Sequence, residues 1–365
     1  GNDQIGDYQF MPLYNVVTTD VPYQHATGLL PAGLANPYLQ WEETKKLQFG
    51  LDLGFWGDRL LINAGYYHNR SSNQLLSYTL PAMTGFGSVQ RNLPATIRNT
   101  GFEFSVSATI FNTKQFAWNT SFNLTIPENK LVAFPDLEKS TYANQYVIGE
   151  PVQGTTRALD LVGVDPASGI FVFLDKSGMF TSGPVIPDDY TKLNVGAPEL
   201  FGGWQHTFRA GTFEFGFLLQ FVDQDGPGYA YGNRPGHFVS FNQESVRANQ
   251  PVTVMDRWQK PGDEAFFQKF SSAYRVDVLL PYVYASNLSD GRFSDASFIR
   301  LKNAFLSWNI PAAWTGAVRM QQASLYIQGQ NLLTITDYTG MDPESQSIIN
   351  LPPLRIITIG ARLTL

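Results

Sequence analysis

The sequence contains no arrangement of residues that is typical of an enzyme active site. Its four histidines, His25, His68, His206 and His237, are scattered, and neither H-E-x-x-H nor G-x-S-x-G occurs. The chain has no cysteine, which removes a thiol nucleophile, a cysteine-based zinc site and a disulfide framework from its chemistry. We therefore predict that the chain is not an enzyme, holds no metal and needs no cofactor.

Two features of residues 223–232 allow more than one interpretation. Asp223 and Asp225 have side chains suited to a cation site, although acids in loops are more often simply solvated. The stretch GPGYAYG at 226–232 is rich in glycine, but no strand and helix flank it as in a nucleotide-binding loop. The favoured interpretation is a loop turn.

Aromatic side chains gather in one long segment around this stretch. Aromatic planes pack against the apolar faces of sugar rings and against peptides, so these residues are candidates for a substrate site or for the interface with a covering partner. The alternative is that they pack the loop against its neighbours. The candidates are Tyr229, Tyr231, Phe238, Phe241, Trp258 and Phe266, with Phe267 beside them.

The composition limits the class of protein. Charged residues make up 15% of the 365 residues, against roughly a quarter in typical soluble domains. A formal charge of −6 without a basic cluster argues against nucleic-acid binding. No run of about 18 apolar residues is present, so we expect no membrane helix. The opening GNDQIGDY lacks a signal-peptide pattern, which suggests either a removed signal or part of a longer polypeptide.

Apolar and polar residues alternate along many segments, as they do in β-strands. In residues 101–111, Phe102 and Phe104 lie on one face of an extended chain, whereas Glu103 and Ser105 lie on the other. Ten strands are predicted, at 8–17, 46–55, 59–69, 101–111, 117–126, 197–209, 213–222, 297–309, 321–333 and 357–365. A sustained helical period is almost absent.

Short and long connections alternate between these strands. The predicted short turns lie at 54–59, 112–115, 210–212 and 311–320. The predicted long segments lie at 18–38, 70–96, 127–196, 224–295 and 334–353. An up-and-down barrel with short periplasmic turns and long extracellular loops requires this regularity, whereas a Greek-key sandwich does not.

A soluble sandwich and a membrane barrel place the apolar face differently. A sandwich turns it toward a dry core, whereas an outer-membrane barrel turns it toward lipid and its polar face toward a wet lumen. Here the polar face is rich in hydroxyls and amides but poor in Lys and Glu, which favours the barrel. Two girdles of interfacial aromatic residues are also expected, with Trp56, Trp118 and Trp314 near the short turns and Trp41, Tyr67 and Tyr338 near the long loops.

Inward-facing polar side chains are expected to line the path of a polar solute. The alternative is a structural lattice of hydrogen bonds that holds the strands together. These residues are Asp52, Glu103, Glu214, Tyr326, Gln328, Gln330 and Arg362. Asp295 and Arg300 are expected instead to fix a loop to a strand end.

Several motifs carry a family resemblance. They are GNDQIGDY at the start, NPYLQWEETKKLQFGLDLGF at 36–55, RNTGFEF at 98–104, RWQKPGDE at 257–264, DASFIRLKNAFLSWNIP at 295–311 and LYIQGQNLLTITDYTGMDPE at 325–344. Taken in this order, they resemble the C-terminal part of the SusC/RagA family of TonB-dependent outer-membrane transporters. The resemblance covers nearly the whole chain.

This resemblance implies an all-β fold in which residues 1–365 supply about ten C-terminal strands of a transmembrane, antiparallel, up-and-down barrel of 22 strands. The plug and the N-terminal strands would then be absent from this sequence, and residues 127–196 and 224–295 would be long extracellular loops. The implied location is the outer membrane, in contact with its lipid. The implied partners are a SusD-like lipoprotein and the TonB complex.

Two departures from the family pattern concern details of this chain. The stretch DPASGIFVFLDKSG at 165–178 lacks a run of acidic ligands, so we do not expect bound calcium there. The chain ends on Leu365, whereas such barrels commonly end on an aromatic residue.

The function implied by the resemblance is uptake of oligosaccharides or peptides by a TonB-dependent importer that works with a SusD-like lipoprotein. The alternatives are a passive outer-membrane porin, an unpaired siderophore-type receptor and a soluble β-sandwich carbohydrate-binding module. A plug and a TonB box in the same polypeptide would exclude the porin, and retention in detergent would exclude the soluble module.

Overall fold

A computed structural model describes residues 5, 7–17, 28–228, 230, 250–271, 274–317, 320–347 and 350–364. Most of the ordered elements are β-strands, as the alternating sequence predicts. The described helices are few, and none of them is long and apolar enough to cross a bilayer.

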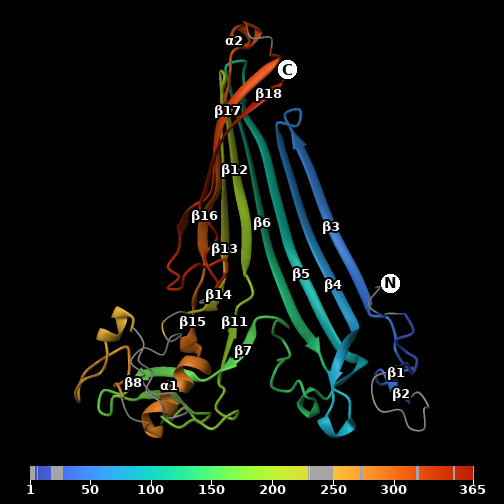
Figure 1. Cartoon of the computed structure of the whole chain (residues 1–365), viewed down its shortest axis with the longest axis vertical. Coiled ribbons are helices and arrows are strands. Elements are labelled where there is room, and N and C mark those ends of the chain that lie inside the picture. The colour runs from blue at the N-terminus through green and yellow to red at the C-terminus, as the bar shows by residue number, and fades with distance from the viewer. Residues whose placement is uncertain are drawn as a thin grey trace. The chain divides into compact units, whose positions relative to one another are not determined.

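Nine strands form the main sheet, and the chain order gives the spatial order. From one edge to the other the sheet runs β18-β17-β16-β13-β12-β6-β5-β4-β3. The strands are β3 (Glu43–Phe55), β4 (Leu60–Thr79), β5 (Ser88–Asn112), β6 (Phe116–Ala133), β12 (Leu200–Ala210), β13 (Phe213–Asp223), β16 (Phe298–Asn309), β17 (Gln322–Ile335) and β18 (Ile356–Thr364). Figure 1 shows β12, β13, β16, β17 and β18 running side by side.

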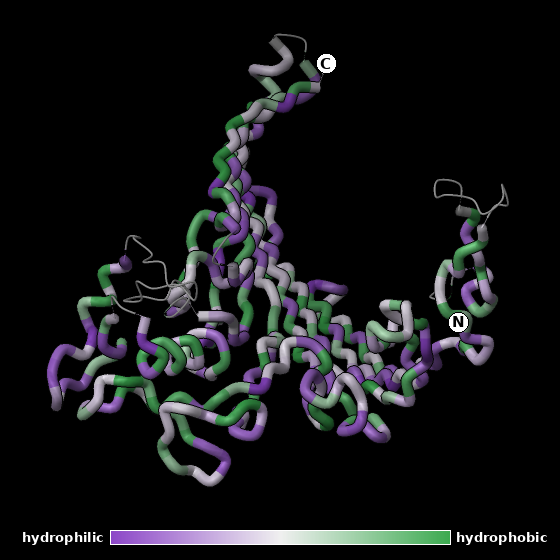
Figure 2. The backbone as a smooth tube through the Cα atoms, turned by 60° about the horizontal axis from the view of Figure 1, so that its bottom comes forward, coloured by the Kyte–Doolittle hydropathy of each residue, from purple (hydrophilic) through white to green (hydrophobic). Residues whose placement is uncertain are grey.

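The up-and-down topology and the short turns are confirmed. The strand pairs from β6 and β12 to β17 and β18 are antiparallel, and the sheet neighbours follow each other along the chain. Gly211 and Thr212 alone separate β12 from β13, and the short helix α2 (Ala312–Ala317) lies between β16 and β17. The hydropathy colours in Figure 2 alternate along these strands.

The predicted strand at 8–17 differs from the structure. Only Tyr14–Val17 is extended, as β1, and it pairs with β2 (Gly28–Pro31) in a separate two-stranded sheet. Its sequence QFMPLYNVV does not alternate regularly, and Pro12 removes a backbone donor. The main sheet among the described residues therefore has nine strands rather than ten.

The predicted long loop at 70–96 is mostly strand. β4 continues to Thr79 and β5 begins at Ser88, so only a short connection with the 3-10 turn η1 (Ala82–Thr84) separates them. Twenty residues of β4 span about 65 Å, far more than the apolar band of about 25 Å in an outer-membrane barrel. The outer part of this hairpin buries Leu93 and Ala95 in a local core with Leu76 and Tyr78 packed against it, so its apolar residues do not follow the lipid-facing alternation.

The chain divides into two compact units. The first contains residues 1–49, 66–101 and 128–152. Its core lies beside the long β5–β6 pair and consists of Leu93, Ala95, Leu131, Phe134 and Leu137, with η2 (Leu137–Lys139) contributing the last residue.

The second unit contains residues 50–65, 102–127 and 153–365. It holds the sheet strands β12 to β18 and a loop module built from the two long segments that follow β6 and β13. The module contains β7 (Thr155–Ala158), β8 (Asp160–Val164), β9 (Phe171–Leu174), β10 (Phe180–Thr181), β11 (Lys192–Val195), η3 (Val252–Met255), α1 (Val276–Asn287) and η4 (Asp290–Arg292). β14 (Asp225–Pro227) pairs with β15 (Phe293–Asp295) where the second segment leaves and rejoins the sheet.

The loop module has its own apolar core. Leu159, Phe171, Phe267, Tyr282 and Ala285 are at most 2% exposed and pack together from both long segments. The side chain of Gln268 closes this core, because its oxygen accepts from the Phe171 N–H and its amide donates to the Val278 carbonyl. Residues from 153 onward of the first predicted loop and the described part of the second thus share one folded module.

Candidate functional site

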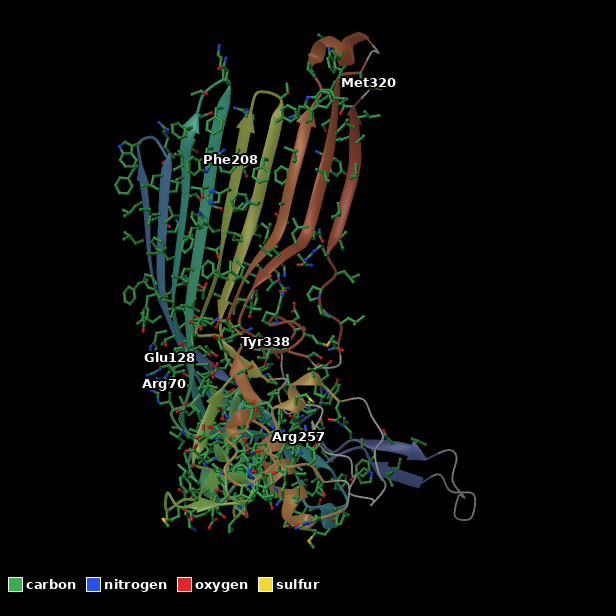
Figure 3. All side chains as sticks on the ribbon, turned by 90° about the vertical axis from the view of Figure 1, so that its left-hand side faces the viewer. Arg70, Glu128, Phe208, Arg257, Met320 and Tyr338 are labelled. Atoms are coloured by element: carbon green, nitrogen blue, oxygen red, sulfur yellow. The ribbon has the colours of Figure 1, made fainter. Side chains whose placement is uncertain are left out.

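Cross-strand register builds an apolar band on one face of the sheet. Trp118, Phe208 and Phe215 are direct partners on β6, β12 and β13, and their rings stack at centroid distances of 5.5 and 6.1 Å. The row continues through Leu306, Ile327 and Ile359 on the next three strands. Figure 3 marks Phe208 on β12.

This apolar band is exposed rather than covered by a second sheet. Leu306 is 44% exposed, Ile327 is 43% exposed and Ile359 is 79% exposed. An apolar surface of this extent is unfavourable in water and is the surface that an outer-membrane barrel presents to lipid. The interpretation in which phenylalanine rows fill a dry sandwich core is therefore wrong.

His206 lies on this apolar face, where a titratable side chain is unexpected. Its Nδ1 accepts a hydrogen bond of 3.2 Å from Trp118 Nε1, and its ring centroid lies 4.6 Å from that of Trp204. Surrounding rings leave it only 6% exposed. His206 is therefore held by its aromatic neighbours and is not available as a catalytic group.

The opposite face of the sheet is polar in the same register. Glu214, Ser307 and Tyr326 are direct partners on β13, β16 and β17. The ring of Tyr326 lies against Gly360 of β18, where an added Cβ would come within 2.5 Å of the tyrosine. Gln328, Gln330 and Arg362, also predicted to line a lumen, occupy the same face by strand alternation.

The polar face also carries Asp52 and Glu103 on the other sheet strands. The carboxylate of Asp52 on β3 accepts a hydrogen bond from the Asn63 amide on β4, and Asn63 Oδ1 accepts one of 3.2 Å from Ser105 Oγ on β5. Glu103 lies two residues before Ser105 and so shares its face. Asp52 therefore takes part in a cross-strand lattice.

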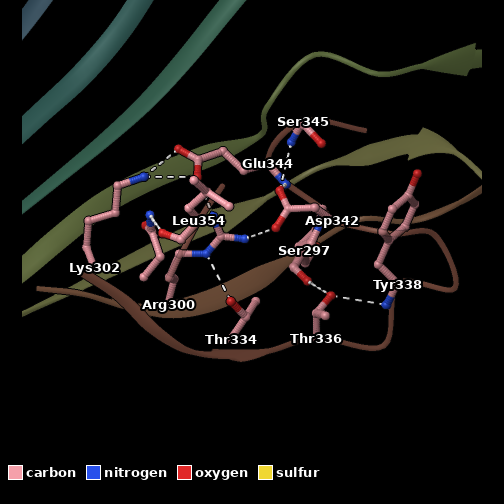
Figure 4. A network of polar contacts seen from close by, with 12 residues as sticks. Ser297, Arg300, Lys302, Thr334, Thr336, Tyr338, Asp342, Glu344, Ser345 and Leu354 are labelled. Carbon is pink, nitrogen blue, oxygen red and sulfur yellow. Dashed lines mark hydrogen bonds and ion pairs between the residues drawn. The ribbon is translucent and has the colours of Figure 1, made fainter. Parts of the chain in front are cut away.

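A buried arginine ties the segment after β17 to β16. Arg300 is 1% exposed and is the centre of the polar network in Figure 4. Its Nη2 donates to Asp342 Oδ2, its Nη1 donates to Glu344 Oε2 at 2.5 Å, and its Nε donates to Thr334 Oγ1 at 3.0 Å. The prediction that Arg300 fixes a loop to a strand end is confirmed.

The same network reaches the surface through a β-bulge at Lys302. Strand register shifts between Leu301 and Asn303, and the ammonium of Lys302 contacts both oxygens of Glu344, at 2.7 and 2.9 Å. The side chains of Lys302 and Glu344 are 34% and 32% exposed. The buried pair of Arg300 and Asp342 therefore supports a half-exposed pair beside it.

A pocket of about 580 Å³ opens next to this half-exposed pair. We call it the β12–β16 pocket. Phe201, Val222 and Phe298, which are partners on β12, β13 and β16, form an apolar row on the otherwise polar face. The pocket is lined further by Asn123, Pro198, Gly202, Gly203, Leu218, Gln220, Phe221, Gln224, Lys302 and Glu344. This pocket was not among the sites predicted from the sequence.

Trp258, a predicted substrate contact, packs within the loop module. Its indole N–H donates to the Pro166 carbonyl at 2.8 Å, and its ring covers Gly169. Gly169 has φ +71°, and a Cβ there would overlap the indole. These contacts favour the alternative interpretation, in which Trp258 packs one loop against another.

Phe266 is the other described aromatic candidate. It is 48% exposed, and its ring meets that of Phe267 edge-on at 4.9 Å. The four remaining candidates, Tyr229, Tyr231, Phe238 and Phe241, lie outside the described residues. Of the predicted aromatic set, the structure thus describes Trp258, which is packed, and Phe266, which is half exposed.

The acidic residues near β14 and β15 interact with neighbouring protein groups. Ser297 Oγ donates to Asp223 at 3.0 Å, and burial, together with the nearby carboxylates of Asp295 and Asp223, raises the pKa of Asp225. Asp295 accepts from Ser297, which lowers its pKa. Within the described ranges, no group of three histidine or acidic side chains has a metal-binding arrangement.

The stretch at 165–178 uses its two acids to cap turns. The Asp165 carboxylate accepts from Ser168 Oγ and the backbone of Ala167, and the hydroxyl bond above all lowers its pKa. Asp175 accepts in the same way from Ser177 Oγ and the backbone of Met179, which lowers its pKa. Their oxygens thus serve the local backbone.

An antiparallel up-and-down sheet with a continuous lipid-facing band and a polar opposite face defines the wall of an outer-membrane β-barrel. The family model described as TonB dependent receptor-like, beta-barrel matches residues 8–332. The chain belongs to this family. It is therefore an outer-membrane protein, and its family consists of receptors rather than enzymes, as predicted.

Curated relatives agree with this assignment. TonB-dependent receptor P3 of Formosa agariphila is 26% identical over 375 residues, which cover 94% of this chain and 35% of that protein. TonB-dependent receptor SusC of Bacteroides thetaiotaomicron is 24% identical, over 97% of this chain and 35% of that protein. The chain thus spans about a third of the length of these relatives, and its resemblance to the SusC/RagA family is confirmed.

A solved structure supports the fold. The structure of the RagAB peptide transporter superposes with a TM-score of 0.78 at 21% identity, covering all of this chain and 39% of that chain.

Proposed function

We propose that this chain supplies the C-terminal part of the barrel of a larger TonB-dependent importer that takes up oligosaccharides or peptides. The observation that carries the proposal is the nine-stranded sheet with its lipid-facing band, in a chain whose residues 8–332 match the receptor barrel family. The remaining strands and the plug would come from the rest of the protein. The relatives, of which this chain spans about 35%, are long enough to hold both.

We further propose a SusD-like surface lipoprotein and the TonB complex as partners. The similarity to a receptor named SusC and to the RagAB peptide transporter supports a lidded importer. In such an importer the loop module and the lipoprotein capture the solute, and TonB remodels the plug so that the solute passes along the polar face. Catalysis has no part in this mechanism.

Within this proposal the predicted lumen residues have two roles. Glu214, Tyr326, Gln328, Gln330 and Arg362 share one face and are proposed to line the solute path. Asp52 is proposed to be structural because it is bonded to Asn63.

Among the aromatic candidates, we propose Phe266 as a contact for substrate or lipoprotein because it is half exposed. The packed Trp258 is proposed to be structural because it donates to Pro166 and covers Gly169.

The proposal is tested by uptake in cells that produce the full-length receptor. Labelled oligosaccharides and peptides are supplied to cells with and without a working TonB complex, and affinity purification of the receptor reports a co-purifying lipoprotein. We expect uptake that needs TonB and a lipoprotein in equal amount. Uptake that persists without TonB would establish the porin alternative instead, and TonB-dependent uptake without any lipoprotein would establish an unpaired receptor.

A further inference from the structure

The β12–β16 pocket has an apolar lining although it lies on the polar face of the sheet. Elsewhere this face carries polar residues such as Glu214 and Gln328, whereas Phe201, Val222 and Phe298 form a row of three apolar partners. Phe201 remains 41% exposed. Val222 is partly buried and Phe298 is only 4% exposed, so Phe201 is the member of the row whose apolar surface a ligand side chain can cover.

Two polar groups in the pocket have unused hydrogen-bonding capacity. Gln220 Oε1 is buried and has no hydrogen-bond partner in the described part of the chain, so it is an acceptor that lacks a donor. Lys302 Nζ has three donors, and among the described residues it contacts the two oxygens of Glu344. The ammonium can therefore donate to a further oxygen.

These groups match the parts of one amino-acid residue in a peptide. The apolar row suits its side chain, the Gln220 oxygen suits its N–H, and the Lys302 ammonium suits its carbonyl or carboxylate. A neutral sugar can stack a ring face on one aromatic plane, but it has no apolar side chain that would fill the row. A fatty acid has no N–H for Gln220. The ion pair of Arg300 with Asp342 holds Glu344, and through it Lys302, in place.

From this geometry we propose that the β12–β16 pocket binds one apolar residue of a peptide, with its N–H on Gln220 and its carbonyl or carboxylate oxygen on Lys302. The inference rests on the proposed import function and narrows its substrate class from oligosaccharides or peptides to peptides that carry a Leu-like or Phe-like residue. Arg300 acts as a positioning residue for this site.

Gly203 provides a variant that fills the pocket without removing a charge. It lines the pocket, and a Cβ added there would meet Leu218 Cδ1 at 3.4 Å, which is an ordinary contact. Gly203→Leu therefore places an apolar side chain where the ligand residue is proposed to sit. Gly50→Leu is the matched control, because Gly50 lies on the polar side of β3 with no atom within 4 Å of an added Cβ.

The experiment measures peptide affinity by isothermal titration calorimetry on the full-length receptor, purified with any lipoprotein that accompanies it. The probes are a Ser-Leu-Ser tripeptide, its Ser-Asp-Ser counterpart, maltotriose and octanoate. We expect binding of the leucine peptide to weaken at least about tenfold in Gly203→Leu, because the buried apolar side chain is displaced. The Gly50→Leu control should bind as the unaltered receptor does.

A second variant tests the orientation of the ligand. Gln220→Met keeps the size of the side chain and removes the acceptor, so the leucine peptide should bind about fivefold more weakly, whereas octanoate affinity should not change. Equal affinity of Gly203→Leu and unaltered receptor for the leucine peptide would overturn the pocket assignment. Preferential binding of maltotriose or octanoate, lost in Gly203→Leu, would overturn the peptide assignment.

The outcome is separable from that of the proposed function. TonB-dependent uptake that is unaffected by Gly203→Leu would overturn the pocket and leave the importer standing. Peptide binding that needs the pocket, in cells whose uptake ignores TonB, would support the pocket and refute the energised importer.

Discussion

The sheet and the loop module of the second unit are stabilised in different ways. In the sheet, each strand pairs with its neighbour in the chain, and alternate residues meet lipid, as Phe208, Phe215 and Leu306 do. In the module, Phe171 and Tyr282 pack together from segments more than a hundred residues apart. Because the two faces of a sheet strand meet different solvents, apolar and polar residues alternate along its sequence. The core of the module is assembled from short, distant segments, so no such alternation marks it in the sequence.

The largest expected effect lies where a loop is tied to the sheet. Arg300→Met leaves Asp342 and Glu344 without their buried partner, so we expect a loss of about 3 to 5 kcal/mol in unfolding free energy. Urea unfolding of the full-length receptor in detergent micelles, followed by tryptophan fluorescence, measures it.

Lys45→Met serves as the control, because it removes an ion pair with Glu43 in which the two side chains are 77% and 62% exposed. We expect a loss of less than about 1 kcal/mol in unfolding free energy. Equal losses in the two variants would show that burial of the Arg300 pair has no energetic weight.

The second prediction separates the module from the sheet. Phe171 is fully buried, so Phe171→Ala should destabilise the module by about 3 to 5 kcal/mol while the barrel keeps its gel shift on heating. Limited proteolysis of the loops is the measurement.

Phe180→Ala, at a residue 72% exposed in the same module, is the control and should behave as the unaltered protein. If the Phe171→Ala variant also lost its gel shift, the module and the sheet would be one cooperative unit and the comparison would be wrong.

The third prediction tests the sheet alone. Phe104→Arg on the lipid-facing side of β5 should cost about 2 to 4 kcal/mol if the residue sits at the bilayer midplane. The fraction of folded receptor in outer-membrane preparations reports the loss.

Ser107→Arg places the same charge on the polar face of β5, at an exposed position where water accommodates it. We expect its folded fraction to stay close to that of the unaltered receptor. Similar loss in both variants would mean that the two faces do not differ in solvent.

The smallest effect concerns the pH dependence of the module. Burial is the main cause of the raised pKa of Asp290, which accepts from the Leu161 N–H. A raised pKa means that the folded module binds more protons than the unfolded chain, so its stability falls as pH rises from the ordinary aspartate range through the folded pKa.

Asp290→Asn keeps an acceptor for Leu161 and should flatten that dependence. Hydrogen exchange of the module from about pH 4 to 7, corrected for intrinsic rates, checks it. A slope unchanged from that of the unaltered protein would remove Asp290 as its source.

Much of the sheet was predictable because each strand has different solvents on its two faces. The alternation in 213–222 places Phe213, Phe215 and Phe217 on the lipid side, and the structure agrees. The prediction was wrong at 70–96, because Leu93 and Ala95 are buried in a local core there instead of alternating between lipid and water. It also misplaced Tyr338, which is 7% exposed and donates to the Pro227 carbonyl instead of joining an interfacial girdle.

The candidate site was predictable only in part. Arg300 was expected to tie a loop, but its partners Asp342 and Glu344 lie more than forty residues away, and no local pattern indicates them. The β12–β16 pocket did leave a signal, because Leu218 and Val222 occupy polar-side positions of an otherwise regular strand. Its significance needed the pairing with Phe201 and Phe298, which comes from register.

The extra residue at Lys302 changes which positions of β16 point outward. Ile299 and Leu301 share the lipid side with Ala304 and Leu306, so the outward positions are odd-numbered before the bulge and even-numbered after it. The bulge thereby places the Lys302 ammonium on the inner side of the barrel wall without interrupting the apolar surface that faces lipid. Substitutions at such a bulge can change which groups the barrel interior recognises while the lipid-facing surface keeps its apolar residues.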